Sequence, residues 1–318
     1  MTRISYDSRL DPQMREALAQ QQAMAPDLGT AHTRSVVDIR EVYERERAYW
    51  NEGGPAMASS LDITLDGPIG VLPIRIYEPV DYGVNATLMF MHGGGWMVGS
   101  TASHDRIART LADHCKCKTV SVDYRLAPEF KFPVQFEECL AVLHALKAGE
   151  IDNCPGQRLL LAGDSAGANL ALGIALWCRD RHPGLISALA LFYGTFGLSD
   201  SGSRRLYGNG QDGMSRADLT YYRRSYLRSE ADMDDPRYNM LDADLSDMPP
   251  AYIMAAELDP VKDDSLTLAA QYSELGISHE LSVYDGMLHG FLHMSRICDK
   301  ASHALQAGAK FLCRQGLR

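Results

Sequence analysis

The sequence contains no apolar run that approaches the roughly 18 to 20 residues a membrane-spanning helix needs. Residues 1–9 also lack the apolar core of a secretory leader. Basic residues form no stripe, and 31 Lys and Arg stand against 41 Asp and Glu, for a formal net charge of -10. This acidic balance argues against nucleic acid or an anionic membrane surface as a partner. We therefore expect a lipid-free protein of the cytoplasm.

Cysteine is sparse and odd in number, with seven residues scattered through apolar or helical contexts. This usage favours free thiols in a reducing compartment over a disulfide framework. Cys115 and Cys117 have the close spacing of a metal-binding pair, but they lead into a predicted strand and have no second pair of ligands nearby in the sequence. We interpret them as ordinary thiols and expect no bound metal.

The chain does have enough apolar residues for a large core, because 46% of its 318 residues are hydrophobic and 23% are charged. Residues 11–51 carry apolar side chains at helical spacings of three and four and show no strand pattern. We predict one α/β catalytic domain over residues 56–318, preceded by cap helices within residues 1–55.

Strand patterns begin after that helical region. Two alternating runs, 61–65 and 71–77, are joined by a turn rich in Gly and Pro and predict an antiparallel hairpin. Farther along, strand and helix patterns alternate, which predicts a mostly parallel sheet with helices on both faces. The predicted buried strands are 86–91, 118–124, 158–162, 188–192, 251–256 and 280–284.

Residues 197–245 interrupt this alternation with polar loops and one aromatic-rich helix near 217–227. An insertion placed before a late strand of an open α/β sheet lies over the carboxyl edge of that sheet, where such folds bind ligands. We therefore predict that residues 197–245 contribute a second segment to the helical cap.

The strongest chemical signal is the run Gly163-Asp164-Ser165-Ala166-Gly167, which follows an apolar strand pattern and precedes a helical one. A sharp turn between strand and helix exposes a serine hydroxyl above the sheet, and glycines flank the serine because a Cβ there would collide with neighbouring backbone. Such a serine becomes a nucleophile only when a base takes its proton and a carboxylate orients that base. We predict Ser165 as the nucleophile.

The two partners are expected later in the chain, in the order acid and then histidine. Asp259 follows one predicted strand directly, and His289 lies in the loop after the last predicted strand. Both would therefore lie at the same edge of the sheet as Ser165. Asp263 and Asp264 would fall on the helix after Asp259, as caps or surface charges. The sequence thus predicts a triad of Ser165, Asp259 and His289.

Acyl transfer also needs N–H donors for the oxyanion that forms on the carbonyl. Three glycines, 93–95, follow the predicted strand 86–91, and the N–H of Ala166 lies at a helix N-terminus, where the dipole favours negative charge. We predict Gly94, Gly95 and Ala166 as the oxyanion hole. A phosphate loop is the alternative for such a glycine run, but the Gly-Lys-Ser/Thr ending and the acidic residue of dinucleotide sites are missing. We expect no cofactor.

Five motifs occur together in this chain: His92-Gly93-Gly94-Gly95-Trp96, Asp123-Tyr124-Arg125-Leu126-Ala127-Pro128-Glu129, Gly163-Asp164-Ser165-Ala166-Gly167, Asp259-Pro260-Val261-Lys262-Asp263 and His289-Gly290-Phe291. With them the chain resembles the hormone-sensitive-lipase-like branch of the α/β-hydrolases, and within it the bacterial acetyl esterases. The resemblance implies an α/β-hydrolase fold with an eight-stranded sheet and a cap built from the N-terminal helices and a later insertion. It also implies a triad of Ser165, Asp259 and His289 and ester hydrolysis without a cofactor.

The expected function is that of a serine carboxylesterase that acts on acetyl to butyryl esters of small molecules through an acyl-serine intermediate. Trp96 and Phe291 are bulky residues near the predicted site, and we expect them to contact the substrate and limit acyl length. The same triad would serve an amide or N-acetyl hydrolase, and the same fold would serve a non-catalytic ligand-binding or regulatory protein. These alternatives stay open, and a monomer and a homodimer are equally compatible with the sequence.

Overall fold

The computed structural model describes residues 8–24, 33–208 and 214–316. Apolar runs that are buried on both faces form the centre of one eight-stranded sheet. The strand order is β1-β2-β4-β3-β5-β6-β7-β8. The strands are β1 Met57–Gly67, β2 Gly70–Pro79, β3 Thr87–Met91, β4 Lys118–Val122, β5 Leu159–Asp164, β6 Ile186–Phe192, β7 Ala251–Ala256 and β8 His279–Tyr284.

Both sheet predictions are confirmed. β1 and β2 form the antiparallel hairpin, with Leu61 opposite Ile76, and β2 runs antiparallel to β4. From β4 onward in this strand order, that is β4-β3-β5-β6-β7-β8, each strand is parallel to the next. Each predicted buried strand is present, with its ends shifted by at most two residues. Parallel strands place their carboxyl ends at one edge, and the loops after β3, β5, β7 and β8 meet there.

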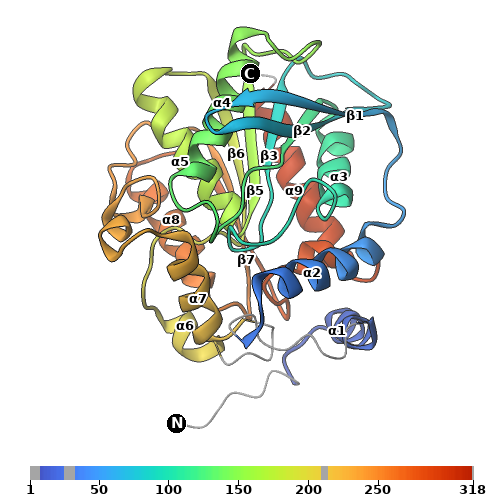
Figure 1. Cartoon of the computed structure of the whole chain (residues 1–318), viewed down its shortest axis with the longest axis vertical. Coiled ribbons are helices and arrows are strands. Elements are labelled where there is room, and N and C mark those ends of the chain that lie inside the picture. Colours follow the sequence, from blue (N-terminus) through green and yellow to red (C-terminus); the bar gives the residue numbers. More distant parts are fainter. Residues whose placement is uncertain (1–7, 25–32, 209–213, 317–318) are drawn as a thin grey trace.

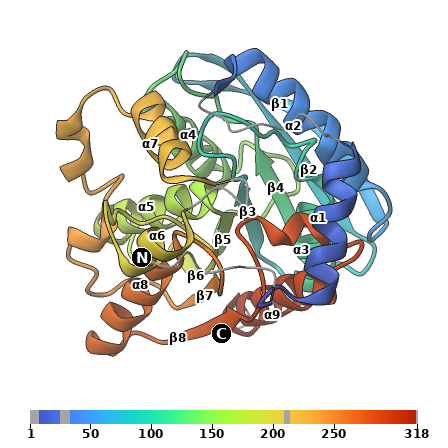
Figure 2. The ribbon, with the colours of Figure 1, turned by 90° about the horizontal axis from the view of Figure 1, so that it is seen from below.

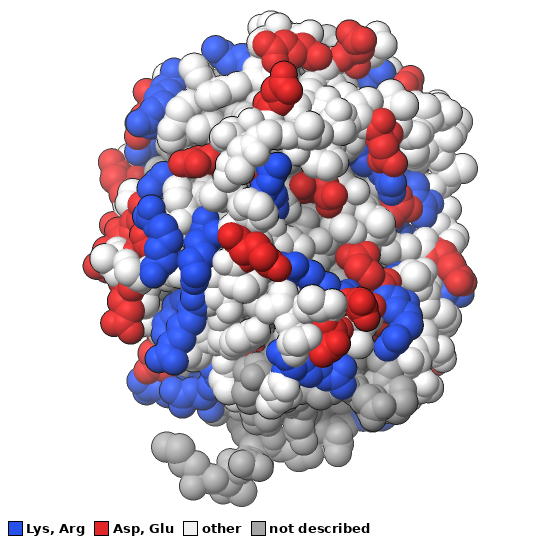
Figure 3. All heavy atoms as spheres, viewed as in Figure 1, with Lys and Arg blue, Asp and Glu red and all other residues white. Residues whose placement is uncertain are grey.

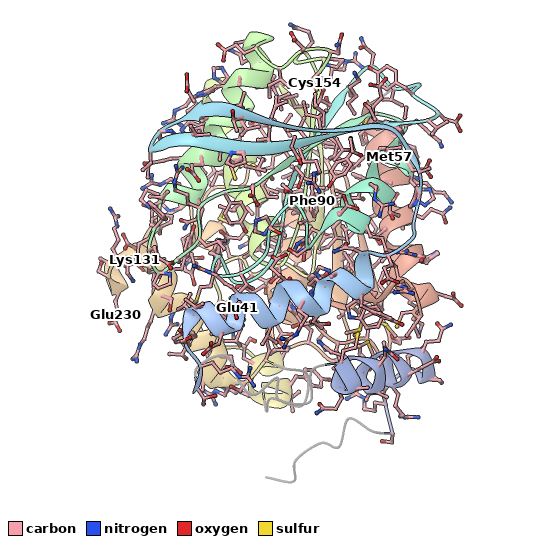
Figure 4. The ribbon with its side chains drawn as sticks, turned by 45° about the vertical axis from the view of Figure 1, so that its right-hand side comes forward. Glu41, Met57, Phe90, Lys131, Cys154 and Glu230 are labelled. Carbon is pink, nitrogen blue, oxygen red and sulfur yellow. The ribbon has the colours of Figure 1, made fainter. Side chains whose placement is uncertain are left out.

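Helices cover both faces of the sheet and separate two apolar cores. On one face lie α3 Asp105–Cys115 and α9 Asp299–Gly316, and on the other lie α4 Val134–Ala148, α5 Ala166–Arg181 and α8 Lys262–Glu274 (Figure 1). Phe90 of β3 is fully buried in the first core, as Figure 4 shows, because its strand is covered on both faces. The sheet is therefore the middle of three layers.

Four more helices lie together at the lower end of the molecule in Figure 1, at the carboxyl ends of the parallel strands. They are α1 Pro12–Met24, α2 Val36–Asn51, α6 Gly202–Tyr207 and α7 Arg216–Tyr226. Seen from below in Figure 2, α1 and α2 lie to one side and α6 and α7 to the other. Glu41, labelled in Figure 4, is an exposed residue of α2.

The ends of these helices follow from local hydrogen bonding. The side chain of Ser35 accepts from the N–H of Asp38 and starts α2, and Ser215 and Asp218 form a reciprocal capping box that starts α7. Short 3-10 helices also occur in the loops, at Glu230–Asp234, Met240–Asp242 and Phe291–Met294. The parts of the predicted cap region at 1–7, 25–32 and 209–213 lie outside the described residues.

The seven cysteines are all free thiols, as expected, and six of them are buried. Cys313 is half-buried, and its thiol lies 3.0 Å from the carbonyl oxygen of Cys115, so α9 contacts the end of α3 there. None of the helices among residues 8–24, 33–208 and 214–316 combines the length and the apolar character that crossing a membrane requires.

Candidate active site

Ser165 lies at the sharp turn between β5 and α5 that its motif predicts. The φ angle of Ser165 is 53°, in the left-handed region that side chains rarely adopt, and its N–H donates to the carbonyl oxygen of Phe192 at 2.9 Å. A Cβ on Gly163 would overlap the backbone of Gly167, and a Cβ on Gly167 would overlap the carbonyl oxygen of Met91 on β3. The two glycines are therefore required for the close packing of strand and helix that exposes the hydroxyl.

Asp259 and His289 reach Ser165 from two other loops at the same sheet edge. Oγ of Ser165 lies 2.8 Å from Nε2 of His289, and Nδ1 of His289 lies 2.8 Å from Oδ2 of Asp259. Asp259 is fully buried, and its other oxygen, Oδ1, accepts the N–H of Val261 at 2.8 Å. The three predicted residues thus form one continuous chain of hydrogen bonds, although 124 residues of sequence separate the serine from the histidine.

The glycine loop after β3 lies beside this chain. Gly94 and Gly95 have φ angles of 115° and 59°, so their N–H groups take directions that other residues would reach only with strain. Within residues 8–24, 33–208 and 214–316, the N–H groups of Gly94, Gly95 and Ala166 have no hydrogen-bond acceptor. All three residues line the same cavity as Ser165, which is the placement that an oxyanion hole requires.

Asp164 is a functional neighbour that sequence reasoning missed. Its Oδ1 accepts the N–H of Gly93 at 2.8 Å and lies 3.5 Å from Nε2 of His104. Burial opposes the charged form, but the adjacent His104 and the hydrogen bonds outweigh it, so the pKa of Asp164 falls below its ordinary value. The ionised carboxylate therefore fixes the glycine loop against the turn at Ser165. The available signal was a carboxyl group at the end of an otherwise apolar strand.

His92 supports the glycine loop and lies outside the hydrogen-bonded chain of Ser165, His289 and Asp259. Its Nδ1–H donates to the carbonyl oxygen of Gly93 at 2.8 Å, and its ring stacks on Tyr124 with the centroids 4.1 Å apart. Burial lowers the pKa of His92 to about 3, with a contribution from nearby His104, so the ring is neutral. His293 is buried as well, and burial lowers its pKa well below the ordinary value.

One group of possible metal ligands occurs within the described part of the chain. The ligand atoms of His104, Asp164 and His293 lie within 4.8 Å of one another, and all three residues are buried. The carboxylate of Asp164 is already bound to the N–H of Gly93 and faces His104, so these groups satisfy part of one another's bonding. We interpret the group as a polar support for the glycine loop.

The cavity at Ser165 has a volume of about 430 Å³. It is lined by α1, α2, α6 and α7 and by the loops that carry Ser165, His289 and Gly94. Trp96 lies in its wall, with its ring stacked on Tyr226 at 4.1 Å. Phe291, which we expected to contact the substrate, does not line this cavity. Phe291 is fully buried and absent from the cavity wall, because its ring packs in the core against Tyr193 and Tyr284.

Asp264 also differs from its prediction as a cap or surface charge. It is fully buried, its Oδ1 accepts the N–H of Phe196 at 2.7 Å and of Gly197 at 3.2 Å, and its Oδ2 is paired with Arg204. Burial raises the pKa of Asp264, while Arg204 and the N–H groups oppose that effect. The carboxylate therefore anchors the beginning of residues 197–245, a contact that the sequence pattern of α8 does not reveal.

Comparisons with known proteins agree with this fold. A family described as having the alpha/beta hydrolase fold matches residues 88–293. A relative named acetyl esterase, from Salmonella paratyphi B, is 41% identical over 276 residues, which cover 86% of this chain and 85% of the relative. A solved esterase of Pyrobaculum calidifontis is 29% identical, with a TM-score of 0.89, and covers 97% of this chain and 100% of its own.

A second solved structure, an ester hydrolase from the metagenome of Lake Arreo, is 27% identical, with a TM-score of 0.89 over 96% of this chain and 98% of its own. Together, the fold and these likenesses define the protein as a carboxylic ester hydrolase. The chain belongs to the hormone-sensitive-lipase-like branch of the α/β-hydrolases. The family predicted from the five motifs is thereby confirmed.

Proposed function

We propose that the protein is a serine carboxylesterase that hydrolyses short-chain acyl esters, from acetyl to butyryl, through an acyl-Ser165 intermediate. The observation that carries the proposal is the chain of hydrogen bonds from Ser165 through His289 to Asp259, with both distances 2.8 Å. This arrangement suits a serine that loses its proton as it attacks.

In the first half of the proposed reaction, Oγ of Ser165 attacks the ester carbonyl carbon as its proton passes to Nε2 of His289. Asp259 keeps Nδ1 protonated and stabilises the imidazolium that forms. The carbonyl oxygen becomes an oxyanion and accepts the N–H groups of Gly94, Gly95 and Ala166. When the carbon–oxygen bond to the alcohol breaks, Nε2 returns its proton to the leaving alcohol.

In the second half, a water molecule attacks the acyl-Ser165 carbonyl and gives its proton to Nε2 of His289. The oxyanion forms again at the same N–H donors. The bond from the acyl carbon to Oγ then breaks, Oγ recovers the proton from Nε2, and the carboxylic acid leaves. No group beyond the chain's own residues and water is needed to balance these steps.

The acyl limit is proposed from the crowding above the glycine loop. A Cβ on Gly95 would lie 2.7 Å from the ring of Tyr222, so α7 covers the oxyanion loop closely. The relatives named acetyl esterases support the same limit. We propose that helices within residues 1–55 and the segment 197–245 together form the cap that encloses the cavity, because both contribute to its wall.

The decisive experiment follows p-nitrophenolate release from a p-nitrophenyl ester series, from acetate to dodecanoate, by the wild type and Ser165→Ala. We expect kcat/KM to fall with chain length beyond butyrate and Ser165→Ala to lose roughly 10³-fold or more. Ser302→Ala, an exposed substitution on α9, is the matched control and should keep full activity.

Three other results would each contradict the proposal. Comparable rates on acetate and dodecanoate would contradict the acyl limit. Faster cleavage of p-nitroacetanilide than of p-nitrophenyl acetate, relative to their uncatalysed rates, would favour an amide hydrolase. A folded wild type with no activity on any ester would favour a binding protein.

We also propose that the protein is cytoplasmic and is a monomer or a homodimer. Cell fractionation would test the location, and sedimentation would test the oligomeric state.

A further inference from the structure

The wall of the catalytic cavity reverses the charge balance of the chain. Acidic residues exceed basic ones by 41 to 31 in the whole sequence. The described residues that line the cavity include five arginines against three carboxylates. These charged residues are Arg34, Arg47, Arg204, Arg216 and Arg223, and Glu46, Asp164 and Asp200. Ester hydrolysis by the triad does not require this excess of positive charge.

Two of the five arginines have carboxylate partners of their own. Arg47 is paired with Glu46 at 2.8 Å, and Arg204 is paired with the buried Asp264. Of the other two lining acids, Asp164 accepts the N–H of Gly93, and Asp200 is paired with a neighbouring arginine of α6 that does not line the cavity. These paired charges stabilise the wall itself. Arg205 and, to a smaller extent, Arg216 lower the pKa of Asp200, so Asp200 offsets part of the charge of Arg216. Arg34 and Arg223 have no carboxylate partner within the described part of the chain.

Arg34, Arg216 and Arg223 form the unpaired set, which we call the arginine cluster. Among residues 8–24, 33–208 and 214–316, none of the three has a hydrogen bond or ion pair to a carboxylate. Arg34 and Arg223 are half-buried, and Arg216 is exposed. Guanidinium groups that line one cavity and have no hydrogen-bonded carboxylate leave an excess of positive charge there, which favours an anionic ligand.

The arginine cluster comes from both segments of the proposed cap. Arg34 lies just before α2, whereas Arg216 and Arg223 lie at the two ends of α7. In Figure 2, α2 and α7 lie on either side of the end of the sheet that carries Ser165. Figure 3 shows basic side chains gathered at the lower left of the surface, the region of α7 and its neighbours in Figure 1. The cluster thus surrounds the cavity from two directions.

We propose that the preferred substrates are short-chain esters that also carry a carboxylate, which the arginine cluster binds while the ester carbonyl lies at Ser165. This inference rests on the proposed function and narrows its substrate class. A guanidinium presents a planar fork of donors that matches the two oxygens of a carboxylate, so it binds and orients this group better than a point charge does. The carboxylate belongs to either the alcohol part or the acyl part of the ester.

Two substrate pairs test the proposal and separate these two sources. For the alcohol part, 4-acetoxybenzoate is compared with methyl 4-acetoxybenzoate. For the acyl part, mono-4-nitrophenyl succinate is compared with 4-nitrophenyl butyrate. The readout is the ratio of kcat/KM for the charged ester to that for the neutral ester, each divided by its uncatalysed rate. We expect the wild type to prefer the charged ester in one pair.

Single Arg→Gln substitutions at 34, 216 and 223 should each lower that ratio by about three- to tenfold, mainly through KM of the charged ester. Arg223→Lys should keep part of the preference, since it retains the charge and loses the fork. Arg224→Gln is the matched control, because Arg224 is exposed on the same helix and does not line the cavity. Its ratio should equal that of the wild type, and 0.5 M NaCl should reduce the wild-type ratio.

The proposal is overturned if, within each substrate pair, the ratio does not differ among the wild type, the three Gln variants and Arg224→Gln. In that case hydrolysis of the neutral esters would still support the serine esterase. Absence of hydrolysis of every ester, charged or neutral, by folded wild type would instead overturn the proposed function itself. The two failures are therefore distinguishable in one set of assays.

Discussion

Replacing Asp259 by Asn tests whether His289 is the base, because the substitution changes which ring nitrogen of His289 carries the proton. Both oxygens of Asp259 accept hydrogen bonds: Oδ1 from the N–H of Val261 and Oδ2 from Nδ1–H of His289, each at 2.8 Å. An asparagine side chain offers an acceptor at only one of these positions. The N–H of Val261 belongs to the backbone and cannot become an acceptor, so the amide oxygen must face it. The amide NH₂ then faces Nδ1 of His289.

That orientation forces Nδ1 to accept and places the proton of His289 on Nε2, which faces Oγ of Ser165. A protonated Nε2 has no lone pair with which to remove the serine proton. The expected loss in kcat is about 10⁴-fold, the size that the wrong tautomer causes in serine proteases, which corresponds to about 5 kcal/mol in the activation barrier. The fold should survive, because the substituted side chain has the same shape and keeps its bond to Val261.

The assay is p-nitrophenyl acetate hydrolysis together with thermal unfolding of each variant. Asp285→Asn is the control, since Asp285 is exposed in the loop that leads to His289 and its carboxylate has no partner among the described residues. We expect the control to match the wild type in both measurements. If Asp259→Asn retained more than about a tenth of wild-type kcat, the argument from fixed amide orientation and tautomer would be refuted.

Two further predictions concern stability. Arg204→Met should destabilise the fold by about 3–5 kcal/mol in urea unfolding, because it leaves Asp264 without its partner in the interior, whereas Arg205→Met on the exposed side of α6 should leave the midpoint unchanged. Equal midpoints for the two variants would contradict this expectation. His92 is neutral in the fold with a pKa of about 3, against about 6.5 when unfolded, so the unfolded chain binds one more proton between these values. Its contribution should therefore lower the free energy of unfolding by about 1.4 kcal/mol for each pH unit below 6.5, down to about pH 3. His92→Asn should show a slope between pH 4 and 6 that is shallower by this amount, and an unchanged slope would exclude the assignment.

The sequence is most informative where local backbone constraints select residue types. The turn at Ser165 needs small residues on both sides, so Gly163 and Gly167 mark it in the sequence alone. The parallel strands can be predicted to within two residues because burial on both faces makes each of them a short apolar run. Asp259 and His289 can then be placed by topology alone, since the carboxyl ends of such strands share one edge.

The sequence is least informative where a residue's position depends on partners far along the chain. Phe291 lies two residues after His289 in the sequence, yet apolar contacts in the core determine where its ring lies. Asp264 resembles a surface residue of an amphipathic helix, and its burial depends on Arg204, 60 residues earlier in the sequence. A periodic pattern records which face of an element is apolar, but it does not record that a distant arginine neutralises a charge on the buried face.

The buried carboxylates have a common structural function at this edge of the sheet. Asp164 accepts the N–H of Gly93, Asp259 accepts the N–H of Val261, and Asp264 accepts the N–H of Phe196. Each bond joins a carboxylate to the backbone of a loop or turn that has no strand partner. Burying a carboxylate is costly unless it is bonded, so each loop is held in the one conformation that satisfies its carboxylate. The glycine loop after β3, the loop that carries Asp259 and the start of the 197–245 segment are therefore fixed by the same kind of interaction.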